Sequence, residues 1–231
     1  MDYYLPIWFQ AIKLTTAVGS GIRCLPFVAS AIISIVISGM LLQKVGYYTV
    51  FMLVSAAFMS IGSGLFTLLT VSSGALRWAS FGVIAGIGIG TGLQMPNIAA
   101  QVVLNRRQVS MGTALMMLGQ SLGGGIFVSV TQSVLNNRLV DAVAQLGVSG
   151  LDASTVMNTG ATQLTDLIPA AQLPAFVVLY NEAIVHGAFF VAVALSVVSM
   201  IGALCMEWRS VRKRQPASPF EDHGAEAEGI Q

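Results

Sequence analysis

The sequence is poor in charged side chains, and this shortage excludes an ordinary soluble domain. Only 9% of its 231 residues are Asp, Glu, Lys or Arg, whereas about a quarter are charged in an average soluble domain. Nine of these 21 side chains lie from Glu207 onward, which leaves twelve for the first 206 residues. Apolar residues make up 55% of the chain and the mean hydropathy is +0.78. The composition therefore predicts a protein whose solvent is a lipid bilayer.

Other shortages narrow the possible functions. A formal net charge of +1 provides no basic surface, so nucleic acid is not an expected partner. The two cysteines, Cys24 and Cys205, adjoin apolar runs and indicate neither a disulfide framework nor a metal site. The tetrapeptide GVSG at 147–150 matches the G-x-S-G of intramembrane serine proteases, but it lies in a polar stretch. With no metal cluster or phosphate-binding loop in the sequence, we expect neither an enzyme nor a cofactor.

The start of the sequence does not show the pattern expected of a signal peptide, and it opens on an apolar, aromatic run that is too short to span a membrane. A transmembrane helix needs roughly 20 apolar residues. We therefore expect residues 1–13 to be the end of a transmembrane helix that begins upstream. The chain would then be part of something longer, or the product of a truncated gene model.

Five later apolar runs are each long enough to cross a bilayer. They predict an all-α fold, a polytopic transmembrane helix bundle of five full spans plus the partial N-terminal helix. The membrane bundle covers 24–206, with a polar loop at 139–174 and a disordered tail at 207–231. The expected spans are 24–42, 48–70, 78–103, 109–135 and 177–206.

The basic residues predict the orientation, because cytoplasmic connections carry an excess of Lys and Arg. One side of the expected topology holds seven of them and the other holds four. The C-terminal tail would therefore be cytoplasmic and the loop at 139–174 external. The seven are Lys44, Arg106, Arg107, Arg209, Arg212, Lys213 and Arg214; the four are Lys13, Arg23, Arg77 and Arg138.

One side of the third span changes from glycines to amides. At 100° per residue, the amides Gln94, Asn97 and Gln101 lie within about 40° of Gly90 around the helix axis. Small residues permit close helix contact, and polar groups within a membrane tend to face the bundle interior. Pro96 removes a backbone hydrogen bond and predicts a kink. The span could line a substrate cavity, or the amides could only join helices. The residues are Gly82, Gly86 and Gly90 for packing, and Gln94, Asn97 and Gln101 for the cavity.

The fourth span offers a similar choice. Gln120 lies on one face with Gly124, and Gly123 is its neighbour. An uncharged amide in mid-span suits a substrate cavity, and it suits a packing contact about as well. Gly123 and Gly124 are further candidates for helix packing.

Further candidates for proton coupling and for the substrate cavity are ionisable and aromatic residues. They lie near the expected outer end of the last span and at the N-terminus. Glu182 and His186 are four residues apart and share a helix face, so they are candidates for proton coupling. The alternative is that Glu182 is an acid near the start of a helix at the solvated membrane interface, where the helix dipole favours a negative charge. Asp2 is a third proton-coupling candidate. Tyr3 and Tyr4 could line a cavity or anchor a helix end at the interface.

The ordered set of motifs resembles fungal transporters of the major facilitator superfamily. The likeness is to the fourteen-spanner drug:proton antiporter branch, and it covers nearly everything before the tail. The matching stretches are YYLPIWFQAIK at 3–13, SGIRCLP at 20–26, GYY at 46–48, QMPNIAAQ at 94–101, GTAL at 112–115, GGGIFVS at 123–129, YN at 180–181 and MEWRSV at 206–211.

Two signatures of that family are incomplete in this sequence. The family's loop signature, roughly G-x-L-x-D-[RK]-x-G-[RK]-[RK], is echoed at 39–48, but Gln43 replaces the acid and Tyr47 and Tyr48 replace the basic pair. The antiporter signature G-P-x-x-G-G is echoed at 119–124 without its proline. That signature belongs to the N-terminal half of the family, so the echo does not establish antiport.

The resemblance implies the C-terminal half of a major facilitator fold. Family members bind substrate between two six-helix bundles that rock against each other. The expected function is export of a small organic compound or toxin across the plasma membrane, through proton antiport. The expected partners are the lipid bilayer, the substrate, protons and the missing N-terminal half. The alternative is a non-transporting truncated fragment, or a half-subunit that requires a separate N-terminal half.

Overall fold

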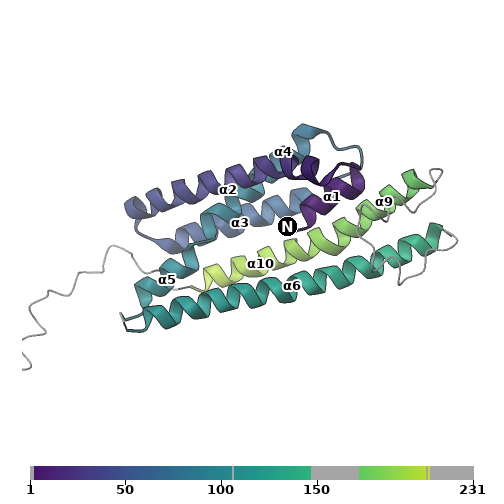
Figure 1. The fold of residues 1–231 in the computed structure, drawn as a ribbon. Coiled ribbons are helices and arrows are strands. Elements are labelled where there is room, and N and C mark those ends of the chain that lie inside the picture. Colours follow the sequence, from purple (N-terminus) through teal and green to yellow (C-terminus); the bar gives the residue numbers. More distant parts are fainter. Residues whose placement is uncertain (1–2, 106, 147–171, 207, 209–231) are drawn as a thin grey trace, which may run out of the picture.

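The computed structural model describes residues 3–105, 107–146, 172–206 and 208, and its elements are helices (Figure 1). Five segments are long and apolar enough to cross a membrane. This confirms the predicted all-helical bundle with five spans. The elements are α1 (Tyr4–Ile12), α2 (Ala17–Val45), α3 (Tyr48–Phe66), α4 (Ala75–Gly92), α5 (Met95–Val103), α6 (Val109–Leu146), α9 (Leu173–Ile184), the π-helix η1 (Val185–Phe189) and α10 (Phe190–Leu204).

The first full span begins earlier than its predicted start at residue 24. The Thr16 hydroxyl accepts a hydrogen bond from the Gly19 backbone N–H, so the cap places the start of α2 at Ala17. The helix ends at Gly46, which adopts the left-handed conformation with φ of 78° and donates its N–H to Leu42. Glycine accepts this conformation without a Cβ penalty, which allows the tight turn into α3.

The third predicted span consists of two helices, α4 and α5, separated at Leu93 and Gln94. Pro96 lies in the first turn of α5. A proline has no N–H to donate to the carbonyl four residues earlier, and its ring clashes with that carbonyl. The kink predicted at Pro96 is therefore confirmed as a break between two helical segments.

The fourth span continues beyond its predicted end at residue 135 and runs to Leu146 as α6. Asn136 and Arg138, which suggested an end, are tolerated because neither removes a backbone donor. The apolar stripe also continues, and its buried members contact the helix formed by α9 and η1. These members are Leu135, Leu139, Ala142 and Val143, which recur at helical spacing.

The helices are packed unevenly. Figure 1 shows α2, α3 and α4 grouped on one side of the bundle and α6 and α10 on the other. α4 packs between α2 and α3, and α10 packs on α3. α6 packs on α5 near its start and on α9 and η1 near its end. Between these contacts, every residue from Ala114 to Val130 except Gly123 is exposed.

Candidate functional site

The glycines of α4 allow close approach to α2 and α3. A Cβ on Gly86 would collide with the carbonyl oxygen of Phe27, and one on Gly90 with the carbonyl oxygen of Ala31, both in α2. On the opposite side of α4, a Cβ on Gly88 would lie 2.7 Å from the Met59 nitrogen of α3. The two contacting backbones leave no volume for larger residues at these points.

The other three packing candidates have more room. A Cβ on Gly82 would lie 3.4 Å from the Phe27 Cβ, which is an ordinary contact. Nothing within the described part of the chain lies within 4 Å of a Cβ on Gly123 or Gly124. Within the described ranges, these two glycines of α6 therefore face open space.

A pocket between the α4–α5 break and α6 brings two of the predicted cavity residues together. Its volume is about 370 Å³, and it is lined by Asn97 from α5 and Gln120 from α6. Asn97 is half-buried, and its Oδ1 is buried without a hydrogen-bond partner among the described residues. Gln120 is exposed on the open face of α6. The remaining lining residues are Gly92, Leu93, Pro96, Leu115, Met116 and Gly119.

The other cavity candidates lie elsewhere. Gln94 and Gln101 are exposed and are not among the residues that line this pocket. Tyr3 is 57% exposed. Tyr4 is buried, and its hydroxyl lies 3.2 Å from the Val128 carbonyl oxygen and 3.3 Å from Oε1 of Gln132. Tyr4 thus joins α1 to α6.

Of the proton-coupling candidates of the last span, Glu182 lies in α9 and His186 in the π-helix that follows it. His186 is inside η1, and its Nδ1 lies 2.9 Å from the backbone carbonyl oxygen of Glu182. Its ring stacks on Phe190 at 5.3 Å between centroids. Both candidate side chains are exposed, and both line two pockets of about 200 and 490 Å³ at this end of the bundle. Asp2 is outside the described residues.

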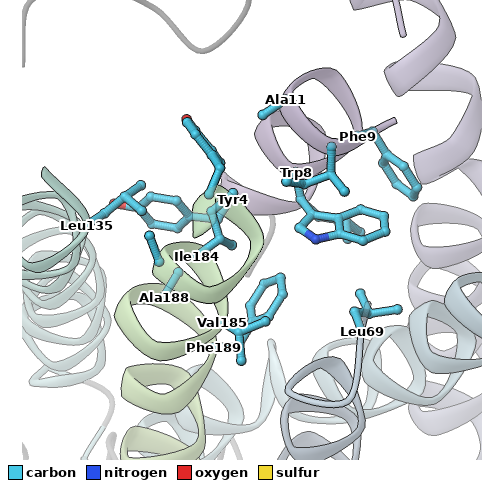
Figure 2. Close-up of a cluster of buried hydrophobic side chains, with 14 of the residues drawn as sticks. Tyr4, Trp8, Phe9, Ala11, Leu69, Leu135, Ile184, Val185, Ala188 and Phe189 are labelled. Carbon is cyan, nitrogen blue, oxygen red and sulfur yellow. The ribbon is translucent and has the colours of Figure 1, made fainter. Parts of the chain in front are cut away.

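A buried polar network joins α1, the end of α3 and α9, and it was not singled out from the sequence. Trp8 is fully buried, and its Nε1 donates to Oδ1 of Asn181 at 2.8 Å. The Asn181 amide then donates to the Leu69 carbonyl oxygen at 3.1 Å. Figure 2 shows Trp8 and Leu69 facing the same space as Val185 and Phe189. A tryptophan and a mid-helix asparagine were the only available signals, and neither specifies its partner.

A lysine in the connection after α1 extends this network. The Lys13 ammonium donates to the carbonyl oxygens of Val71 at 2.6 Å and Ser73 at 2.8 Å, and it lies 5.8 Å from the Trp8 ring centroid. Lys13 therefore ties α1 to the connection between α3 and α4.

Within the described ranges, no group of three His, Cys, Asp or Glu side chains is placed to hold a metal ion. The chemistry available in the pocket at Asn97 is hydrogen bonding and apolar contact. The proton-coupling candidates Glu182 and His186 both line two other pockets, which share no residue with the pocket at Asn97.

Comparisons with known proteins identify relatives along almost the whole chain. The MFS-type efflux pump MFS1 of Arthroderma benhamiae is 44% identical over 220 residues, which is 94% of this chain. The efflux pump roqT of Penicillium rubens is 40% identical over 96% of it, and the aspyridones efflux protein of Neocamarosporium betae is 37% identical over 94%. No family model and no solved structure matches the chain.

The matches cover only part of each relative. The chain spans 41% of the length of MFS1 and of roqT, and 38% of the aspyridones efflux protein. These relatives are transporters and not enzymes, as expected from the sequence. The apolar helices together with this similarity show an integral membrane polypeptide. Over almost its whole length the chain therefore corresponds to a part of the fungal transporters of the major facilitator superfamily (MFS) type to which it is similar.

Proposed function

We propose that this chain is the C-terminal half of a plasma-membrane transporter that exports a small organic compound in exchange for protons. The observation that carries the proposal is the similarity to fungal efflux pumps over more than nine tenths of the chain. The exposed stretch of α6 also supports this proposal, because it leaves a face on which a second bundle can pack. Substrate would bind between the two bundles and be exposed to each side in turn.

In this proposal the two kinds of candidate residue have separate roles. Asn97 and Gln120 contact the substrate near the α4–α5 break, with Gln94, Gln101, Tyr3 and Tyr4 as further cavity residues. Glu182 and His186, with Asp2, exchange the coupled protons, because ionisable groups within membrane segments are the usual sites of proton transfer.

The proposal is tested by transport with the full-length protein in vesicles. We expect efflux of a dye that depends on a pH gradient and stops when a protonophore collapses that gradient. The 231-residue chain alone should show no such efflux, because alternating access needs two bundles. Gradient-dependent efflux by the chain alone would contradict the two-bundle mechanism. If the full-length protein failed to export any compound, the transport function itself would be wrong.

The proposed topology places the C-terminus in the cytoplasm. A tag fused after Gln231 should be labelled by an impermeant reagent only after the cells are permeabilised. The control is a tag inserted after Ser149, within the proposed outer loop, which should be labelled in intact cells. The opposite pattern would reverse the orientation.

A further inference from the structure

The end of the bundle where α6 packs on α9 and η1 carries four ionisable side chains around one pocket. This pocket of about 200 Å³ is lined by Arg138 and Asp141 from α6 and by Glu182 and His186 from α9 and η1. All four side chains are exposed, so water and protons can reach them. The pocket therefore brings charges of opposite sign together from two segments that are remote in the chain.

Close packing between α6 and the last span holds the two walls of this pocket in place. α6 packs on both α9 and η1. A Cβ on Gly187 of η1 would lie 3.3 Å from the Cα of Leu135 in α6, so there is little room between the two backbones. The small side chains of Ala142 and Ala183 line the pocket beside its charged groups. The separation of the charges on the two walls is therefore set by the packing of the helices.

The backbone determines which nitrogen of His186 can take up a proton. Nδ1 lies 2.9 Å from the backbone carbonyl oxygen of Glu182. A carbonyl oxygen only accepts hydrogen bonds, so in the neutral imidazole Nδ1 carries the hydrogen and Nε2 carries the lone pair. The ring also stacks on Phe190, with 5.3 Å between the two centroids. Nε2 is therefore the atom that binds an additional proton, on a ring whose orientation is held by two contacts.

The charges that line the pocket act on this proton with opposite signs. The guanidinium of Arg138 disfavours a second positive charge on the imidazole, whereas the carboxylates of Asp141 and Glu182 favour it. The second pocket at His186 adds side chains of the connection between α3 and α4, and the polar ones among them are uncharged hydroxyls. Lys13 binds two carbonyl oxygens of that connection and lines neither pocket in the part of the chain that the structure describes.

We propose that His186 takes up the coupled proton at Nε2, and that Arg138 and Asp141 are positioning residues that set the pH at which this happens. The proposal rests on the transport function proposed above. It adds two residues of α6 to the proton-exchanging group on the last span. Because the pocket lies between these two helices, uptake of the proton changes the electrostatic interaction between them.

The test measures the protonation of His186 directly and does not depend on transport. Diethyl pyrocarbonate acylates only an unprotonated imidazole nitrogen, and mass spectrometry gives the modified fraction of His186 in the full-length protein in nanodiscs. The rate of modification is measured from about pH 5 to 8, where an imidazole ordinarily changes its charge. We expect Arg138→Gln to move the midpoint of this rate to higher pH and Asp141→Asn to move it to lower pH. Each shift should be roughly half a pH unit, the size expected for a charge acting across a solvated pocket.

Matched variants separate the effect of charge from a purely structural effect. Arg138→Lys keeps the positive charge and should keep the wild-type midpoint. Arg77→Gln removes an exposed cation at the start of α4, which lines neither pocket, and should also leave the midpoint unchanged. His186→Asn keeps an N–H donor for the Glu182 carbonyl but cannot take up a proton. This variant should keep the thermal stability of the wild type and lose the pH dependence of efflux.

Three results would overturn the proposal: no modification of His186, midpoints that do not move in opposite directions in the two α6 variants, or a wild-type pH profile of efflux in His186→Asn. The last result would leave the transport function itself intact. If the wild-type protein exports no compound, the transport function is wrong, and the modification midpoints still decide whether Arg138 and Asp141 control the protonation of His186.

Discussion

The end of the bundle around Trp8 and the middle of α6 are both rich in apolar residues, but they differ in how they are packed. Around Trp8, side chains from α1, α6, α9 and η1 form a continuous buried cluster with a polar network inside it. Along α6, Leu118, Leu122 and Ile126 are all more than half exposed. Hydropathy alone does not separate the two regions. The difference teaches that burial here depends on which neighbour each helix has, and among the described residues the middle of α6 has no neighbouring helix that covers it.

The largest expected effect comes from removing the side chain at the centre of the packed region. Trp8→Ala should destabilise the chain by about 3–5 kcal/mol, because it leaves a cavity and removes the donor to Oδ1 of Asn181. Phe127→Ala, on the exposed part of α6, should change stability by less than about 0.5 kcal/mol. Heating a fluorescent fusion in detergent and measuring the remaining monodisperse peak compares the two. If both variants lowered the apparent melting temperature equally, the two regions would not differ in how their packing contributes to stability.

The next largest difference in stability is expected between a glycine of the packed region and a glycine on the exposed face of α6. Gly86→Leu should cost about 3 kcal/mol or more, since the new side chain meets the backbone of α2 in any context. A leucine at position 124 would have open space among the described residues, so Gly124→Leu should leave the stability of this chain nearly unchanged. In the full-length transporter the same change should lower folded yield, because α6 then meets the second bundle. If Gly124→Leu were harmless in both contexts, that face would meet lipid.

Asn181 tests the polar network inside the packed region. Asn181→Leu should cost about 2 kcal/mol, because it leaves the Trp8 N–H and the Leu69 carbonyl buried without partners. In a Trp8→Phe background, which removes one of those orphaned groups, the same change should cost less. Apparent melting temperatures of the four proteins give the coupling. Strict additivity would mean that the two side chains do not act together.

The smallest expected effect is at Lys13. Lys13→Met keeps most of the apolar stem but loses two hydrogen bonds to backbone carbonyls, so a loss of about 1 kcal/mol is expected. Lys44→Met, in the last turn of α2 near the opposite end of the bundle, provides the comparison. A larger loss of stability for Lys44→Met than for Lys13→Met would show that the end of the bundle around Trp8 is not the more strongly stabilised one.

The spans could be predicted from the sequence because each is a long apolar run that only a helix can satisfy in a membrane. The break at Pro96 also followed from the chain, since proline lacks a donor. The extension of α6 to Leu146 was missed because Asn and Arg were interpreted as an end, although the apolar stripe through Leu139 and Val143 continues. Whether an apolar stripe is buried depends on the helix that packs against it, and the local sequence does not identify that helix.

Of the candidate site residues, the structure brings Asn97 and Gln120 to one pocket and leaves Gln94 and Gln101 outside it. Helix angles put the three amides of the third span on one face, but the angles assume one continuous helix. The break before Met95 separates Gln94 from the other two, whereas Gln101 lies one turn beyond Asn97 in the same helix α5 and is outside the pocket. The positions of the four amides therefore depend on packing between helices that are far apart in the chain.

The sequence by itself determined that this protein is a membrane-embedded helix bundle, where each helix runs to within a few residues in most spans, and which family it resembles. These follow from hydropathy, from backbone hydrogen bonding in lipid and from local motifs. Only the tertiary structure decided that Trp8 pairs with Asn181, that Gly86 meets α2 while no described residue meets Gly124, and that Asn97 and Gln120 line one pocket. Each of these depends on distances between side chains that are remote in sequence, and no local pattern encodes such distances.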